Sequence, residues 1–305
     1  MSFKKVINIT LIVFFIAFST MFCLSRFNNT PLIEGNNDTL QIYEWWHIES
    51  FEGGGANRQN YLNKLALSYE KQNPTIMFMV KLVDADQLED ALTRGTPHLI
   101  SFSEQVAKTV LPYLKSFDSE YNIQDNFLES ATYNGKLMAI PFIASGYCYF
   151  TKTTIKDDLT IYTSNNNLHN VTNLVKNETI NNGDTLSSYE CYTKFVNSNN
   201  VKLLGTARDL FRIKNLESLG RFSVNYEPVS TFTDLIQYLG KTTNDKQINK
   251  FINYIMNDTN QRKLSELSLF STKHLKLYSE TTYSQMEECL KSCFVPNIFT
   301  MEHFT

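Results

Sequence analysis

The residues best suited to chemistry lie in one short stretch of the sequence. Both tryptophans of the chain, one histidine and three glutamates fall within residues 44–52: Glu44, Trp45, Trp46, His47, Glu49 and Glu52. A tryptophan ring at a crevice can stack on a sugar while its N–H donates a hydrogen bond. Paired carboxylates can act as acid and base on a glycoside. Core packing of the tryptophans and a merely polar loop are the competing interpretations, and the residues alone leave both open.

Other motifs of enzymatic sites are missing from the sequence. It contains no Gly-x-Ser-x-Gly elbow, no His-Glu-x-x-His and no phosphate loop. Gly53-Gly54-Gly55 lacks the spaced glycines of a dinucleotide site, so we expect a flexible turn from strand to helix there. His47 alone is no metal site, and we interpret it as a hydrogen-bonding group for a ligand. The sequence therefore predicts neither catalytic residues nor a metal or cofactor.

The N-terminus is typical of an exported protein. Two lysines precede an apolar run over residues 6–24, which fits a secretory signal and is also long enough to span a bilayer. Cys23 offers a lipidation site, but Phe22 stands where a lipoprotein signal has a small residue. We expect residues 1–25 to be a signal peptide or membrane anchor and residues 26–38 a linker. The mature protein would then stand at the extracellular face of the cell membrane.

Composition limits the partners and the number of domains. The chain has 28 basic and 31 acidic residues, a net charge of −3 and no basic block, so a nucleic-acid-binding surface is not expected. Its 305 residues, 42% of them hydrophobic, suffice for two domains with buried cores. We expect the cysteines that follow the signal to be small core residues, with their disulfide state left open. They are Cys148, Cys191, Cys289 and Cys293.

Strands and helices alternate along the first part of the chain. Hydrophobic patterning predicts strands at 40–46, 76–83 and 98–102, a helix over 57–72, and a short helix from an Asp86 cap to Arg94. The second strand is continuously apolar, as in strands buried on both faces of a parallel sheet. This alternation implies an open α/β sheet with right-handed crossovers.

Patterning is weaker in the rest of the chain. Tyr133-Asn134-Gly135-Lys136 is a hairpin turn signal, and strands are predicted beside it at 137–142 and 147–151. Residues 153–186 are rich in Asn and Thr, and no regular structure is expected there. The remaining predicted elements are helices at 189–196, 245–257 and 261–267, a strand at 201–205, a segment at 209–213 continuing beyond a turn, and a short helix or strand at 234–239.

Four segments in consistent order carry a family resemblance. They are residues 42–55, the Gly-Thr-Pro-His-Leu-Ile-Ser-Phe run at 95–102, the Tyr-Asn-Gly-Lys-Leu-Met-Ala-Ile-Pro-Phe run at 133–142, and residues 203–212 with 232–239. These segments resemble extracellular solute-binding proteins of bacterial ABC importers, of the sugar-binding type. The chain departs from the family pattern at His98 and Ala207 and in a shortened second lobe.

The resemblance implies an α/β, bilobal, type II periplasmic-binding-protein-like fold with a hinge and a ligand cleft. The first lobe would comprise residues 39–146 and about 226–242, and the second residues 147–225 and about 243–305. A protein of this kind captures a small polar ligand, here a carbohydrate, and delivers it to ABC permease subunits without chemistry on the ligand. Two alternatives remain: a surface-anchored interaction protein that kept the fold without transport, and a secreted glycosidase.

By position in the family pattern, four regions supply ligand contacts. They follow the first strand, follow the third strand, form the crossing segment, and begin the second lobe. The implied ligand-binding residues are Trp46, His47, Glu49, Ser50, Ser101, Ser103, Ser145, Gly146, Tyr147, Thr206 and Arg208.

Overall fold

The structure, a computed structural model, describes residues 39–49, 51, 57–118, 120–153, 160–163 and 186–300. Residues 41–305 form one of two compact units of the chain and contain all the helices and strands discussed below. The expected signal or anchor at 1–25, the linker at 26–38 and the Gly53–Gly55 turn lie outside the described residues. In the described part of the chain, no helix is both long and apolar enough to cross a membrane.

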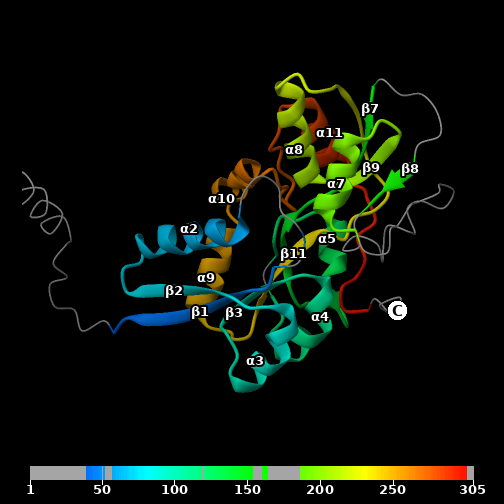
Figure 1. Ribbon diagram of the computed structural model, residues 1–305. Helices are drawn as coiled ribbons and strands as arrows, with labels where there is room; N and C mark the ends of the chain where they lie inside the picture. Colours follow the sequence, from blue (N-terminus) through cyan, green and yellow to red (C-terminus); the bar gives the residue numbers. More distant parts are fainter. Residues whose placement is uncertain are drawn as a thin grey trace, which may run out of the picture. The chain divides into compact units, whose positions relative to one another are not determined.

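A five-stranded sheet contains the predicted first strands (Figure 1). Its order is β2 (Ile76–Leu82), β1 (Gln41–His47), β3 (Leu99–Phe102), β11 (Ile236–Lys241) and β6 (Ile140–Ala144). The first three strands run parallel, and β11 is antiparallel to both β3 and β6. The open α/β sheet predicted from the alternation is therefore present, with one strand inserted from late in the chain.

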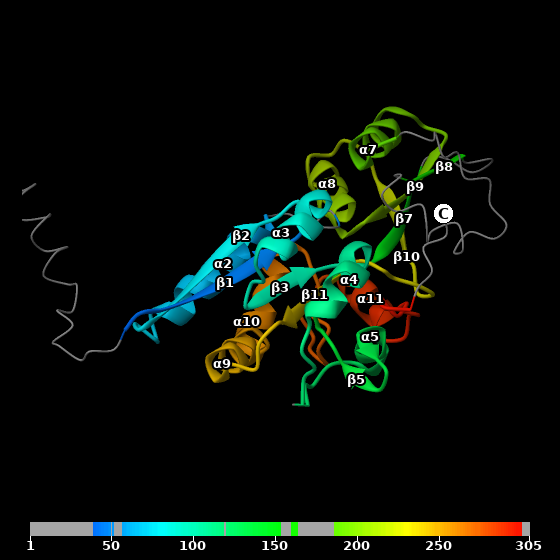
Figure 2. The same ribbon diagram turned by 90° about the horizontal axis from the view of Figure 1, so that it is seen from below.

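Two amphipathic helices cover one face of this sheet. Helix α2 (Arg58–Glu70) begins at Asn57, whose side chain accepts the Asn60 backbone N–H and so caps the helix. Helix α9 (Lys246–Ile255) places Phe251 against Trp45 and Phe78, with ring centroids 5.5 and 3.8 Å apart. The short helix α3 (Leu88–Arg94) lies on the opposite side of the sheet from α9 (Figure 2).

Strand β2 differs from its predicted burial on both faces. Ile76 and Phe78 are buried, whereas Met77 and Met79 are 41% and 47% exposed. The alternation arises because β2 is the edge strand and α2 covers only its inward face. At the outer edge, the Phe78 backbone N–H donates to the Glu70 carboxylate at 2.7 Å.

Two local predictions also need correction. Asp86 does not cap a helix, because it lies inside the 3-10 turn η1 (Ala85–Gln87) that leads into α3. The hairpin turn is present, with φ of 51° at Asn134 and 73° at Gly135. However, it joins only β4 (Thr132–Tyr133) and β5 (Lys136–Leu137). The longer strands predicted beside it are β6 and β7, which belong to different sheets.

A four-stranded sheet forms the second part of the unit. Its order is β10 (Val224–Pro228), β7 (Tyr147–Lys152), β9 (Val201–Thr206) and β8 (Thr160–Tyr162). Helices α7 (Ser188–Asn197), α8 (Ala207–Ser218) and α11 (Thr281–Leu290) pack against it. Strand β8 lies where no regular structure was expected, and residues 209–213 belong to α8. That helix begins with a capping box between Thr206 and Asp209.

Two neighbouring crossings connect the sheets. Residues 145–146 lead from β6 to β7, and residues 229–235 lead from β10 to β11. The Ser145 backbone N–H donates to the Leu235 carbonyl, and the Thr233 hydroxyl donates to the Ser145 carbonyl, both at 2.8 Å. The Tyr147 hydroxyl donates to Asp234 at 2.7 Å. The two crossings are therefore hydrogen-bonded to each other.

The segment that contains α9, which we expected to belong to the second lobe with residues 243–305, packs on the five-stranded sheet. Helix α9 packs on the five-stranded sheet, and α10 (Asp258–Arg262) and the 3-10 helix η4 (Lys263–Leu267) follow it directly. Phe270 then exchanges two backbone hydrogen bonds with Ala144 of β6. Three shorter helices complete the described elements: α4 (Glu104–Val110), η2 (Leu111–Tyr113) and α5 (Asp125–Ser130).

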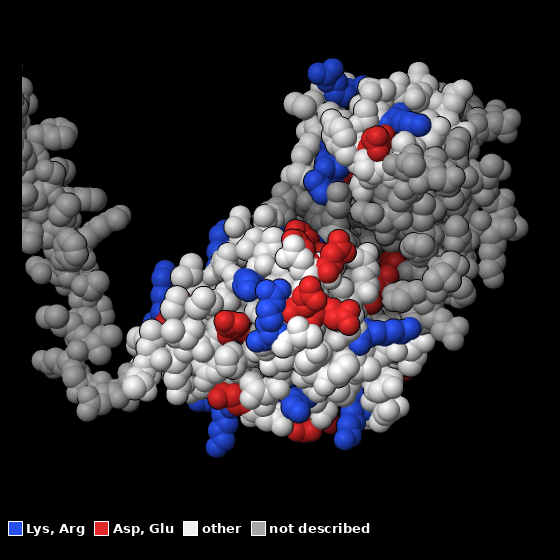
Figure 3. Space-filling model, turned by 60° about the horizontal axis from the view of Figure 1, so that its bottom comes forward, with Lys and Arg blue, Asp and Glu red and all other residues white. Residues whose placement is uncertain are grey.

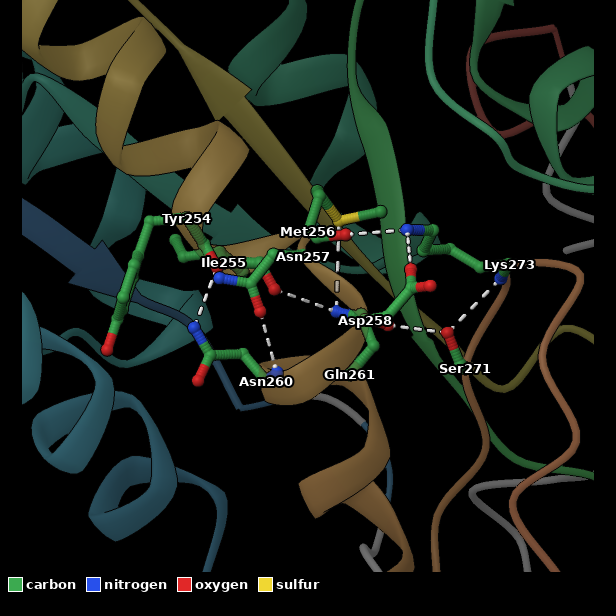
Figure 4. A network of polar contacts seen from close by, with 9 residues as sticks. All are labelled: Tyr254, Ile255, Met256, Asn257, Asp258, Asn260, Gln261, Ser271 and Lys273. Carbon is green, nitrogen blue, oxygen red and sulfur yellow. Dashed lines mark hydrogen bonds and ion pairs between the residues drawn. The ribbon is translucent and has the colours of Figure 1, made fainter.

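A buried polar network holds this segment in place (Figure 4). The Gln261 side chain donates to the Ile255 carbonyl at 3.2 Å and accepts from the Ser271 hydroxyl at 2.6 Å. The Lys273 ammonium donates to the Met256 carbonyl and pairs with Asp258. Because Gln261 is fully buried and Ser271 nearly so, the partners of Gln261 have no water to replace a lost hydrogen bond.

We expect Gln261→Leu to lower the free energy of unfolding by about 2–3 kcal/mol, because it leaves a buried carbonyl and a hydroxyl unpaired. Urea unfolding monitored by circular dichroism measures the change. The control is Gln72→Leu, at an exposed position shortly after the end of α2. This substitution should change the free energy of unfolding by less than about 0.5 kcal/mol. Equal effects of the two substitutions would contradict the role given to the network.

Candidate functional site

A cluster of buried polar side chains lies where β1 and β3 end. His47 is the last residue of β1, and its Nδ1 lies 3.3 Å from the Ser101 hydroxyl on β3. The Gln237 amide of β11 donates to the same hydroxyl at 2.9 Å and to the Ile48 carbonyl at 3.1 Å. In open α/β sheets, this carboxyl edge is where ligands bind.

Gln237 reaches the cluster from a strand that is far away in the sequence. The register between β11 and β6 shifts between Gln237 and Tyr238, and such an irregularity redirects side chains. The amide oxygen of Gln237 accepts a hydrogen bond from the Arg58 guanidinium at 3.3 Å. Gln237 thereby joins the two strand ends to the start of α2.

Arg58 is a buried cation. It is 1% exposed, it donates to the Phe51 carbonyl, and its guanidinium carbon lies 4.2 Å from the centre of the Phe51 ring. Its ion-pair partner is Glu49, at 3.6 Å, with a side chain 55% exposed. Burial lowers the pKa of Arg58 to about 10, opposed by the Glu49 carboxylate, so the guanidinium remains charged at neutral pH.

His47 is neutral in this cluster. Burial, and secondarily the charge of Arg58, lowers the pKa of His47 to about 3. Its Nε2 is buried with no hydrogen-bond partner among the described residues. A neutral imidazole at physiological pH can accept or donate one hydrogen bond at each nitrogen, but it brings no charge to the site.

Most of the predicted ligand residues fall into two groups. The first contains His47, Glu49 and Ser101, which belong to the cluster around Arg58. The second contains Ser145, Gly146 and Tyr147 at the crossing, with Thr206 paired to Tyr147 in the four-stranded sheet. Ser103 precedes α4, and Ser50 lies outside the described residues.

Burial distinguishes these residues sharply. Of the predicted ligand residues that the structure describes, Glu49 alone is exposed, and Arg208 is partly buried. The others are buried: Trp46, His47, Ser101, Ser103, Ser145, Gly146, Tyr147 and Thr206. Glu49 is therefore directly accessible from solvent, whereas the buried side chains are not.

Trp46 lies in the wall of a groove but does not offer an open ring. It is 4% exposed, its Nε1 donates to Glu44 at 3.1 Å, and the Lys81 ammonium lies 5.3 Å from its ring centre. The groove, of about 760 Å³, runs between β1, β2 and α3 and includes Asp84 and Arg94. In this conformation Trp46 is not a stacking platform, and Trp45 belongs to the core.

Sequence reasoning did not identify Arg58 and Gln237. Arg58 gives one weak signal, an arginine in the first turn of a predicted helix that follows the tryptophan stretch. Gln237 gives none, since it lies in a segment predicted only as a short helix or strand. Their contact joins positions 179 residues apart, which local patterning cannot detect.

Other classes of site find no support in the described residues. They contain no group of three His, Cys, Asp or Glu side chains arranged to hold a metal. Cys148, Cys191, Cys289 and Cys293 are free thiols, and only Cys289 is not fully buried. The face shown in Figure 3 carries scattered basic side chains and a group of acidic ones, not the basic stripe of a nucleic-acid-binding surface.

The pKa of His47 predicts a specific pH dependence. The folded-state pKa lies below that of an unfolded chain, so full stability is present above about pH 6.5 and falls as the pH drops towards 3. We expect His47 to account for a loss of about 2 kcal/mol in the free energy of unfolding between pH 7.5 and 5. Urea unfolding at both pH values should show this loss in the wild type but not in His47→Gln. His274→Gln, at an exposed position, should retain it, and an undiminished loss in His47→Gln would refute the assignment.

Comparison with known proteins identifies the fold. No protein-family model matches the sequence, and no curated protein matches it. A cyclo/maltodextrin-binding protein complexed with maltotetraose is similar, with a TM-score of 0.61 and 11% identity, over 88% of each chain. The sugar-binding protein MalE from the phytopathogen Xanthomonas citri matches with a TM-score of 0.62 and 11% identity, over 85% of this chain and 88% of that one.

The GacH receptor of Streptomyces glaucescens, solved without ligand and with acarbose, has a TM-score of 0.56 and 13% identity, over 84% of this chain and 88% of the receptor. These TM-scores demonstrate a common fold, but sequence identities this low leave the ligand and the partners undecided. The resemblance drawn from the sequence is confirmed at that level: the chain has the α/β, two-sheet, type II periplasmic-binding-protein fold of the maltodextrin- and sugar-binding proteins.

Proposed function

We propose that this protein is the extracellular capture protein of an ABC importer and binds a carbohydrate between its two α/β lobes. The observation that carries the proposal is the two-sheet fold, with polar residues gathered at the carboxyl edge of the five-stranded sheet. Export through residues 1–25 and delivery to permease subunits are parts of the same proposal.

The chemistry available at this edge suits reversible binding. A capture protein needs an affinity in the micromolar range, or about −8 kcal/mol. A few hydrogen bonds to charged and neutral groups, with partial burial of the sugar rings, supply that free energy. Glu49 and Arg208 are the predicted contacts that are accessible from solvent, and His47, Ser101 and Tyr147 are buried.

The paired connections favour a hinge. Residues 145–146 and 229–235 are hydrogen-bonded to each other, so we expect the two lobes to rotate about them together. A ligand that touches both lobes stabilises the closed arrangement, since it has more contacts there than in the open one. In this proposal, closure is the signal that the permease recognises.

The carboxylates of the tryptophan stretch do not favour the glycosidase alternative. Glu44 accepts a hydrogen bond from Trp46, and Glu49 is paired with Arg58. Glu52 lies outside the described residues. The burial of the Trp46 ring instead favours, as a second candidate, a surface interaction protein that kept the fold without sugar transport.

A panel of oligosaccharides tests the proposal by thermal shift. At one hundred times its dissociation constant, a bound saccharide adds about 2.7 kcal/mol to the free energy of unfolding, which raises the melting temperature by several degrees. We expect at least one of maltotetraose, maltotriose, xylotriose or their isomers to do so. Polyethylene glycol of similar size, the control, should have no effect. If no saccharide raises the melting temperature or produces heat in calorimetry, the second candidate is favoured.

A further inference from the structure

The Glu49 carboxylate occupies a defined place at the carboxyl edge. Its side chain is 55% exposed, yet it is paired at 3.6 Å with a guanidinium that is itself buried. An exposed glutamate ordinarily moves among several rotamers. Here the buried partner restricts it, so a carboxylate is presented to solvent in a preferred orientation.

The guanidinium of Arg58 is in turn held by several other groups. It donates to the Gln237 amide oxygen at 3.3 Å and to the Phe51 carbonyl, and it lies over the Phe51 ring. These contacts use the planar fork of the arginine, which a lysine ammonium cannot reproduce. Arg58 therefore links the exposed carboxylate to β11, the strand that follows the second crossing.

Stability alone gives a poor reason for this arrangement. Removing a cation from water is unfavourable, and apolar residues of similar volume often stabilise a protein equally well or better. Burying a guanidinium to pair it with one exposed carboxylate is therefore unfavourable as a means of stabilising the fold. The arrangement is well suited to fixing that carboxylate at a position where a ligand can contact it.

We propose that Arg58 is a positioning residue, which holds Glu49 so that its carboxylate accepts hydrogen bonds from hydroxyl groups of a neutral saccharide. The inference rests on the proposed function and names the ligand's chemistry at this edge. The Arg58–Glu49 pair has no net charge. The carboxylate of Glu49 repels an anionic group, and the guanidinium behind it offsets the attraction of the carboxylate for an ammonium group. Neutral hydroxyl donors therefore fit best. Hydrogen bonds from hydroxyls to an ionised carboxylate are stronger than neutral ones.

Calorimetry with three variants tests the inference. The probe is maltotetraose, or the panel saccharide with the largest thermal shift. We expect Glu49→Gln and Arg58→Lys each to weaken binding about tenfold, as for the loss of one charge-assisted hydrogen bond. The double variant should bind no more weakly than Glu49→Gln, because Arg58 then has no carboxylate to position. The matched controls Glu89→Gln and Arg262→Lys lie at exposed positions and should bind like the wild type.

A second ligand separates positioning from a purely structural role. In Glu49→Gln the charge of Arg58 is no longer balanced, so this variant should bind maltobionate, the acid form of maltose, at least threefold better relative to maltose than the wild type does. This measurement does not use Arg58→Lys, so it also covers the case in which that variant fails to fold.

The possible failures are distinguishable. If no saccharide of the panel binds the wild type, both the proposed function and this inference are overturned. If a saccharide binds and Arg58→Lys binds it like the wild type, or the two losses simply add, only the inference is overturned. An unchanged preference between maltose and maltobionate in Glu49→Gln has the same meaning.

Discussion

The buried positive charge of Arg58 determines which groups can surround it at the carboxyl edge of the five-stranded sheet. Arg58 remains ionised in a buried position, so every group around it must offer an oxygen or an aromatic face. That requirement accounts for the side chain of Gln237 and the carbonyl of Phe51. His47 is neutral mainly because burial lowers its pKa, and the nearby charge of Arg58 lowers this pKa further. The guanidinium is thus the group that the other members of the polar cluster surround.

The same requirement connects distant parts of the chain. Gln237 belongs to β11, which enters the five-stranded sheet between β3 and β6 after the chain has built most of the second sheet. The Arg58–Gln237 contact fixes this inserted strand to the start of α2. Helix α9 packs beside α2 on the same face of the sheet, and the network around Gln261 holds the segment that follows α9. Local order at the edge therefore depends on a strand that comes from late in the chain.

Particular residues mark how far the sequence alone could predict this structure. The periodic stripe and Asp245 cap of α9, and the Asn57 cap of α2, are local signals, and both helices are found where patterning placed them. Strand alternation places the neighbouring residues Trp45 and Trp46 on opposite faces of the sheet, but it does not reveal that Lys81 lies over the ring of Trp46. The position of β11 and the burial of Arg58 depend on contacts across more than a hundred residues. No short-range pattern contains these contacts, which is why the sequence alone points to neither Arg58 nor Gln237, whereas Glu49 could be proposed from its place after the first strand.

The bond between Glu70 and the Phe78 amide has a consequence for how this protein coexists with its own copies. An edge strand with unpaired amides and apolar side chains is a template for the addition of a foreign strand. Met77 and Met79 give β2 an exposed apolar surface. However, the Glu70 carboxylate already accepts a hydrogen bond from the Phe78 amide, which an incoming strand would need for pairing. It also places a negative charge beside the edge. A glutamate on a neighbouring helix thus blocks one of the positions at which another strand could add to this edge.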